Sequence, residues 1–102
     1  MSDIAAPPRI IGRSCGWEVG SRLYTKDGRK CGNAVIVEPV FLVLKRSHAW
    51  VVVTDDGTEM TATYNDLNEL FHPPEWRMDP RTAPGYVKWM LNRNRPTYGE
   101  HV

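Results

Sequence analysis

Short runs of β-branched and alternating apolar residues, each too short for a helix, dominate residues 19–63. Glycine at Asp27-Gly28 and at Asp56-Gly57 supplies the positive φ of a tight turn, so both pairs predict hairpin turns. A further turn is expected over Lys45–His48, and Pro39, which lacks an N–H, predicts an edge, bulge or bend. The predicted strands are 22–25, 33–38, 40–44, 49–54 and 58–63. Five short strands with tight turns are typical of a small, strongly bent β-barrel.

The apolar spacing changes to the helical period after Thr63. Leu67, Leu70 and Phe71 lie three and four residues apart, which predicts a short helix whose apolar face plugs the barrel. Thr63 can cap this helix at the backbone amide of Asp66. The prolines at 73 and 74 end it.

A second helix is expected from Pro84 to Asn92 or Arg93, with Thr82 as its cap. Residues 75–80, with Trp76 as an anchor, are expected to form an irregular connector. The helix is apolar around too much of its circumference for a lone surface helix. We therefore expect it to pack outside the barrel and to offer its other side to a partner. Its apolar residues are Tyr86, Val87, Trp89, Met90 and Leu91.

The amino-terminal residues 1–16 are expected to form an extended arm, because Pro7-Pro8 disfavours a helix. Ile10-Ile11 is the exception, since adjacent β-branched residues predict a strand or a segment docked on a surface. The predicted organisation is an arm (1–16), a barrel with its closing helix (17–72), a connector with the outer helix (73–95) and a tail (96–102).

Composition places the chain among ordinary globular proteins, because 41% of its 102 residues are hydrophobic and 25% are charged. No apolar run reaches the roughly 20 residues that cross a bilayer, and the first residues lack a secretory pattern. We therefore expect synthesis in the cytoplasm and no membrane partner. Cys15 and Cys31 are either reduced thiols or one disulfide of an exported protein, and the missing signal favours reduced thiols.

Charge is segregated along the chain although the net charge is only +1. Residues 9–30 are mainly basic, 55–79 mainly acidic and 81–95 basic again. If the fold keeps these segments apart, the molecule has opposite faces suited to head-to-tail association with copies of itself or with another charged partner. If the fold interleaves them, the charges simply solvate the surface.

Part of the chain resembles PRC-barrel and other SH3-like domains. Val19–Tyr24 followed by Asp27–Ala34 is similar to their opening strand, turn and second strand, and Trp50–Gly57 with Leu67–Phe71 to their closing strands and terminal helix. The resemblance covers about half of the chain and implies an SH3-like five-stranded barrel that serves as a binding platform. In compact size and style the sequence is also similar to small uncharacterised bacteriophage proteins.

The sequence carries no pattern that indicates catalysis, a metal or a cofactor. A nucleophile, a base and an acid can be chosen from separate segments, but no local signature joins them. The three histidines are far apart, so we expect no zinc site, and no glycine-rich phosphate loop is present. The residues considered for such a triad are Cys15 or Cys31, His48 or His72, and Asp55 or Asp66.

These patterns favour a non-enzymatic assembly or interaction protein. The leading hypothesis is a structural component of a phage virion, such as a minor capsid, decoration or connector subunit, bound to other protein subunits or to itself. The alternative is a small regulatory module that binds a host protein or nucleic acid through the basic first hairpin. The expected partner-binding residues are Ile10, Ile11, Arg22, Tyr24, Arg29, Trp76, Tyr86 and Trp89. The tryptophans among them have core packing as the competing interpretation.

Overall fold

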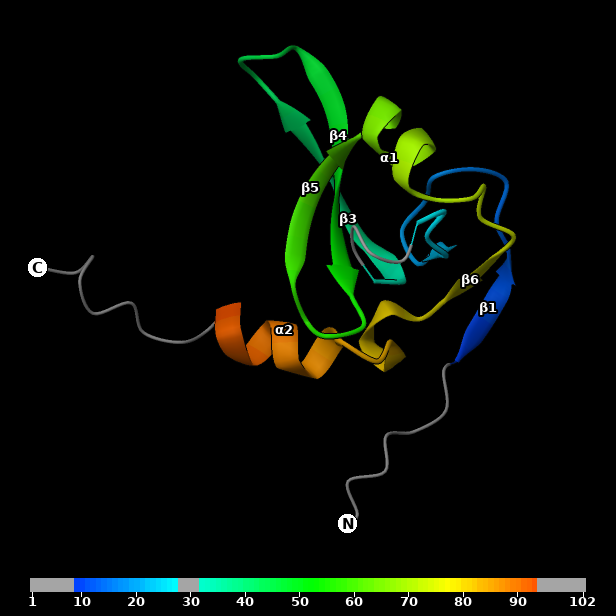
Figure 1. Ribbon diagram of the computed structural model, residues 1–102. Coiled ribbons are helices and arrows are strands. Elements are labelled where there is room, and N and C mark those ends of the chain that lie inside the picture. The colour runs from blue at the N-terminus through cyan, green and yellow to red at the C-terminus, as the bar shows by residue number, and fades with distance from the viewer. Residues whose placement is uncertain (1–8, 28–31, 94–102) are drawn as a thin grey trace, which may run out of the picture.

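The structure, a computed structural model, describes residues 9–27 and 32–93 and is mainly β, as predicted (Figure 1). A curled four-stranded sheet, a small two-stranded sheet and two helices make up the fold. In chain order the elements are β1 (Ile10–Arg13), β2 (Arg22–Leu23), β3 (Ala34–Leu42), β4 (Ser47–Thr54), β5 (Glu59–Thr63), α1 (Tyr64–Leu70), β6 (Trp76–Met78), a 3-10 helix η1 (Pro80–Thr82) and α2 (Tyr86–Arg93).

The larger sheet has the order β2-β3-β4-β5, and each neighbouring pair is antiparallel. Its first face packs against α1 in a core that is almost completely shielded from solvent. Apolar residues from all four strands of this sheet meet Leu67 and Phe71 there, which is the plug predicted from the helical spacing. The buried members of this first core are Leu23, Ala34, Ile36, Val52, Ala62, Leu67 and Phe71.

The predicted strands 33–38 and 40–44 are one continuous strand, β3. The register of β3 on β4 shifts between Ile36 and Glu38, so a bulge directly precedes Pro39, one of the three features predicted from this proline. The turn that follows lies at 43–46 rather than at Lys45–His48. The amide of Arg46 closes this turn by donating to the carbonyl of Val43 at 3.2 Å.

The expectation of an irregular connector over 75–80 is wrong. Trp76–Met78 forms β6, which pairs with β1. Ile10-Ile11 therefore lies in a strand, which confirms one of the two expectations for this segment. Gly20, at φ 93°, brings its backbone against Met78, where a Cβ would lie 2.4 Å from the carbonyl oxygen. A short apolar segment between prolines and charges carried too little pattern to predict this pairing.

Both helices were predicted from local sequence, but the start and the cap of the second helix differ from the prediction. Thr63 caps α1 through a capping box, in which the Asp66 amide donates to Thr63 Oγ1 and the Thr63 amide donates to Asp66 Oδ2. The second helix begins at Tyr86 instead of Pro84, and Thr82 does not cap it. The Thr82 hydroxyl instead accepts from the Arg9 amide and donates to the Asp79 carbonyl.

The second face of the large sheet packs on α2, outside the sheet, as predicted (Figure 1). The helix lies so close to the β4–β5 turn that a Cβ on Gly85 would meet the Thr54 carbonyl oxygen at 2.0 Å. The buried members of this second core are Val35, Val51, Val53, Met78, Ala83 and Trp89. Two cores on opposite faces leave one end of the sheet uncovered, namely the β3–β4 hairpin.

Candidate protein–protein interface

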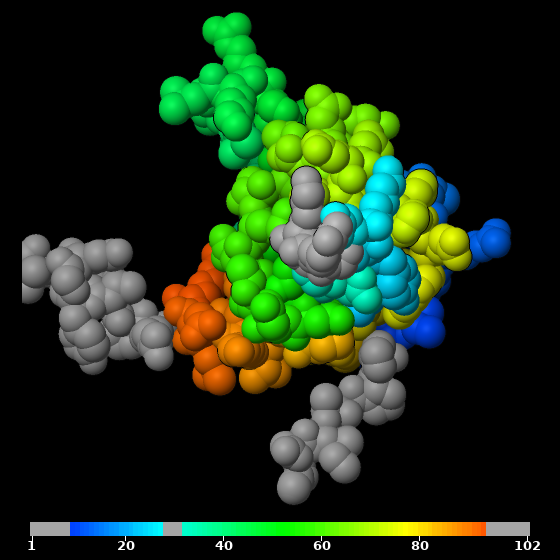
Figure 2. All heavy atoms as spheres, in the orientation of Figure 1, coloured from blue at the N-terminus to red at the C-terminus, as the bar shows by residue number. Residues whose placement is uncertain are grey.

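The β3–β4 hairpin continues past the rest of the sheet and projects from the body of the molecule (Figures 1 and 2). Val40, Ala49 and Thr63 form the last row in which three strands pair. Beyond it, Phe41 pairs with His48, and the next pair closes on the turn, with no third strand beside them in residues 9–27 and 32–93. Each further residue extends a strand by ~3.4 Å, so the turn lies well outside the sheet.

Apolar side chains occupy the projecting part, which we call the hairpin tip and define as Phe41 to Arg46. Phe41 is 51% exposed, Val43 74% and Leu44 100%. The Phe41 ring lies edge-to-face with the His48 ring, at 5.1 Å between the ring centroids. A cluster of large exposed apolar side chains on a projecting hairpin is unusual for an isolated globular protein and is typical of a contact surface.

The tip is cationic, and an acidic residue lies beside it. Lys45 and Arg46 follow the apolar residues, and residues 41–48 contain no carboxylate. A hollow of about 450 Å³ separates the hairpin from the start of α1; we call it the groove. Its lining includes both the carboxylate residue Asp66 of α1 and the cationic residue Lys45 of the tip. The groove is lined by Leu42, Val43, Leu44, Lys45, Thr61, Thr63 and Asp66.

Sequence reasoning missed these tip residues because it placed Val40–Leu44 in a core strand. With the turn predicted at Lys45–His48, Leu44 would have paired with Ala49 and stayed in the sheet. In the structure the turn lies at 43–46 and Val40 pairs with Ala49, so Leu44 lies in the turn.

The outer side of α2 is a second exposed apolar surface, as expected from its sequence. Val87 is 64% exposed and Leu91 68%. Trp89, in contrast, is 5% exposed, and its indole Nε1 donates to Glu59 Oε1 at 2.7 Å. Tyr86 is half-buried beside it at 5.5 Å between ring centroids, so both aromatic residues pack on the second core.

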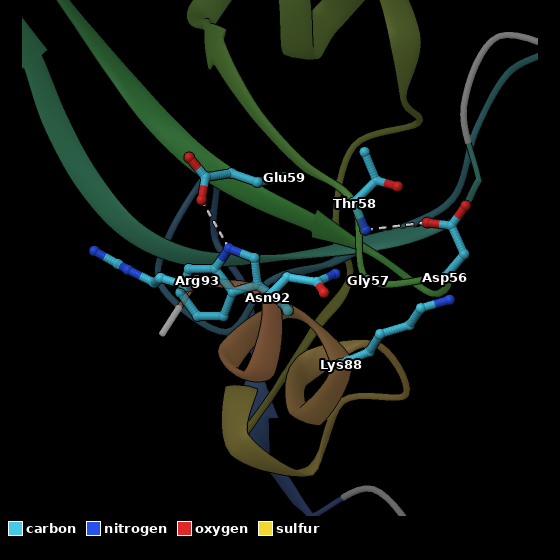
Figure 3. A pocket seen from close by; sticks show the side chains of 8 residues that line it. Asp56, Gly57, Thr58, Glu59, Lys88, Asn92 and Arg93 are labelled. Carbon is cyan, nitrogen blue, oxygen red and sulfur yellow. Dashed lines mark hydrogen bonds between the residues drawn. The ribbon is translucent and has the colours of Figure 1, made fainter. Parts of the chain in front are cut away.

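A hollow of about 490 Å³ lies between α2 and the β4–β5 turn (Figure 3). Its polar groups bond to one another, since the Thr58 amide donates to Asp56 Oδ1 at 3.1 Å and Glu59 accepts from Trp89. Hydrogen bonds from Thr54 and then Thr58 hold the pKa of Asp56 below its ordinary value. The guanidinium of Arg93 lies 5.0 Å from the Trp89 ring centroid. We interpret this hollow as the seam that fastens α2 to the sheet.

The cations of the basic first hairpin that the structure describes make hydrogen bonds within the fold. Arg22 is 9% exposed and donates to both carboxylate oxygens of Asp55, at 2.7 and 2.9 Å. Burial alone would lower the pKa of Arg22, but the hydrogen bonds and charge of Asp55 outweigh burial and raise it. Tyr24, 43% exposed, lies 5.4 Å from this guanidinium, and Lys26 Nζ donates to the Asn68 carbonyl. Arg29 and the turn glycine Gly28 lie outside the described residues.

The small sheet carries the remaining predicted contacts. Ile10 is 66% exposed and Ile11 53%, so β1 carries two exposed apolar side chains. Trp76, on β6, is half-buried against the second core. The structure therefore leaves Ile10 and Ile11 accessible, while Trp76 contributes mainly to packing.

The two carboxylates considered for catalysis have structural roles. Asp55 binds Arg22, and Asp66 completes the capping box of α1. Cys15 is exposed and free, whereas Cys31 lies outside the described residues. Within residues 9–27 and 32–93 no three His, Cys, Asp or Glu side chains are grouped as a metal site would need. Neither α1 nor α2 is long and apolar enough to cross a bilayer.

Comparison with known proteins gives no relative from which a function can be transferred. No protein-family model matches the chain, and no match was found among curated proteins or among solved structures. The resemblance to SH3-like and PRC-barrel domains therefore stays a prediction, and the functional argument depends on the surface alone.

Proposed function

We propose that this protein is a non-enzymatic assembly subunit that holds neighbouring protein subunits, copies of itself among them. The observation that carries the proposal is the hairpin tip, with Leu44 fully exposed and Val43 and Phe41 more than half exposed. Fully burying a side chain of this kind is worth about 1.5–3 kcal/mol, so the tip offers a partner a substantial part of a binding free energy.

Further exposed apolar residues support a subunit with several neighbours. Val87 and Leu91 lie on α2, and Ile10 and Ile11 lie on β1. Figure 1 shows α2, β1 and the hairpin on separate sides of the fold, so one partner cannot cover all three. A subunit of a head-to-tail ring or filament uses two different surfaces. A virion component, the setting suggested by the style of the sequence, is the specific form of the proposal.

Nucleic-acid binding receives no comparable support. Of the cations that suggested it, Arg22 and Lys26 make hydrogen bonds within the fold, and Arg29 and Lys30 lie outside the described residues. Binding to phosphates depends on many uncompensated cations.

Sedimentation velocity of the full chain, from low micromolar to near-millimolar concentration, tests the proposal. We expect the average mass to rise reversibly above the 11.6 kDa of one chain. A mass that stays at one chain throughout, together with tight binding of single-stranded nucleic acid at low salt, would overturn self-assembly and support the regulatory module.

A further inference from the structure

The hairpin tip ends in two adjacent cations, Lys45 and Arg46, and we propose that it is a processing site for an endoprotease that cleaves after basic residues. Cleavage adds water across one peptide bond. The carbonyl carbon of Lys45 or Arg46 gains the hydroxyl group, and the amide nitrogen of the following residue gains the proton. We further infer that assembly through the tip shields this bond, and this second part rests on the proposed function.

Both cations are accessible to an enzyme. Lys45 and Arg46 are exposed and lie in the turn 43–46, at the end of the hairpin that projects from the body of the molecule (Figure 2). Within the described residues neither side chain makes a hydrogen bond or an ion pair. Leu44, which precedes them, is 100% exposed. A basic side chain of the tip can therefore enter the specificity pocket of a protease without first losing a partner.

The part of the hairpin that carries the turn can open by itself. Proteases cut the transiently opened form of a segment. Beyond the row of Val40, Ala49 and Thr63, the hairpin has only two strands among the described residues. The bond from the Arg46 amide to the Val43 carbonyl closes the turn, and Arg46 has φ 50°, in the left-handed region that side chains disfavour. A segment with so few buried contacts opens at a small cost in free energy.

A cut at the tip leaves the body of the fold held together. Residues of β2 and β3 precede the cut and those of β4, β5 and α1 follow it, and both cores take side chains from both fragments. β3 pairs with β4 and β1 with β6 across the cut. Arg22 of the first fragment binds Asp55 of the second. Cleavage therefore divides the tip and destroys it as a contact surface while the subunit stays folded.

Assembly and cleavage compete for the tip. In the single chain its apolar residues are exposed, and in the proposed assembly a neighbouring subunit covers them together with the cations beside them. A segment held by a partner opens less often, and proteases act on the open form. The endoprotease therefore acts on free subunits and spares assembled ones, so cleavage restricts an intact tip to subunits that already have a neighbour.

Limited digestion of the full chain with trypsin, followed by mass spectrometry, tests the site. At low micromolar concentration we expect cleavage after Lys45 or Arg46 to be at least about tenfold faster than cleavage after Lys88, which is exposed but lies within α2. Lys45→Gln combined with Arg46→Gln should abolish the cut at the tip, and the matched control Lys88→Gln should leave it unchanged. The two fragments should elute together, with the circular dichroism spectrum of the intact chain.

Asp55→Ala separates local opening of the tip from unfolding of the whole chain. This substitution removes the partner of the Arg22 guanidinium and should weaken the entire fold. Cleavage after Lys88 should therefore become faster, while cleavage at the tip keeps its native rate. A tip cut that accelerates in proportion to the cut at Lys88 would show that the tip opens only when the chain unfolds, and it would overturn the inference.

Digestion at near-millimolar concentration tests the shielding, with a small arginine amide in the same tube to report the activity of trypsin. We expect the cut at the tip to slow relative to this amide as the average mass rises. Association with unchanged cleavage at the tip would overturn the shielding and, with it, the tip as the contact surface of the proposed function. Equal cleavage at the tip and at Lys88 in a folded chain would overturn the processing site and leave the proposed function standing.

Discussion

Removing Asp55 should destabilise the fold more than removing its partner Arg22. The Arg22 side chain is 10% exposed, whereas that of Asp55 is 39% exposed. Asp55→Ala therefore strands a guanidinium in the protein, while Arg22→Met leaves a carboxylate that water can reach and keeps an apolar chain in the same place. The predicted order of the two losses of stability depends on the unequal burial of the two side chains in one bidentate ion pair.

The magnitude follows from how such pairs behave. Breaking a buried pair by removing one partner costs about 3–5 kcal/mol, and the partial exposure of this pair places Asp55→Ala near the lower limit, about 3 kcal/mol. Arg22→Met should cost about 1 kcal/mol, because dispersion contacts persist. The double variant should be more stable than Asp55→Ala alone, because it no longer buries an unpaired charge.

Urea unfolding at neutral pH, followed by tryptophan fluorescence, measures these differences as shifts of the midpoint at constant slope. Arg81→Ala is the control, because Arg81 makes a similar pair with Asp79 while its side chain is 74% exposed. It should cost less than about 1 kcal/mol. Equal costs for Asp55→Ala and Arg22→Met, or a double variant less stable than Asp55→Ala, would refute the reasoning.

Two further predictions concern α2 and the turn beneath it. Gly85→Ala would force a Cβ against the Thr54 carbonyl, so we expect the free energy of unfolding to fall by about 1–3 kcal/mol. The emission of Trp89 should shift to the red as α2 moves away. Gly12→Ala, which has open space around it, is the control and should be nearly neutral. The pKa of Asp56 is lowered from 3.8 in the folded state, mainly by the hydrogen bond from Thr54. The contribution of Asp56 to folding stability is therefore complete above pH 3.8 and is lost as pH falls through the lower folded-state pKa. Asp56→Asn should therefore flatten the acid side of the stability–pH curve, Glu69→Gln should serve as the surface-carboxylate comparison, and an unchanged curve for Asp56→Asn would exclude the turn as a source of acid sensitivity.

The elements predicted correctly are those fixed by local chemistry. Thr63 and Asp66 stand at the spacing of a capping box, and Leu67 with Phe71 supplies the apolar face, so α1 and its core contact could be predicted before any tertiary contact was known. The turn at Asp56-Gly57 could also be predicted from local chemistry, because Gly57 has the positive φ, 89°, that a tight turn needs. The mainly β class followed from several such local signals agreeing with one another.

The features that sequence missed depend on contacts between distant segments. β6 exists because β1, more than sixty positions earlier, supplies its hydrogen bonds. Trp89 appeared suited to a surface contact, yet Glu59 and the second core hold it inside. Arg22 belonged to a basic cluster in the sequence, but its burial beside Asp55 is a property of the sheet register. The candidate interface was missed for the same reason, because the exposure of Leu44 is set by how far β5 extends.

The central claim, that the exposed hairpin tip joins this chain to neighbouring copies, can be tested most directly by sedimentation velocity of Leu44→Asp beside the native chain, because Leu44 is fully exposed in the single chain. We predict that the average mass of the native chain rises with concentration, while that of Leu44→Asp stays at the 11.6 kDa of one chain over the same range. Equal association of the two proteins, with circular dichroism showing both folded, would contradict the account.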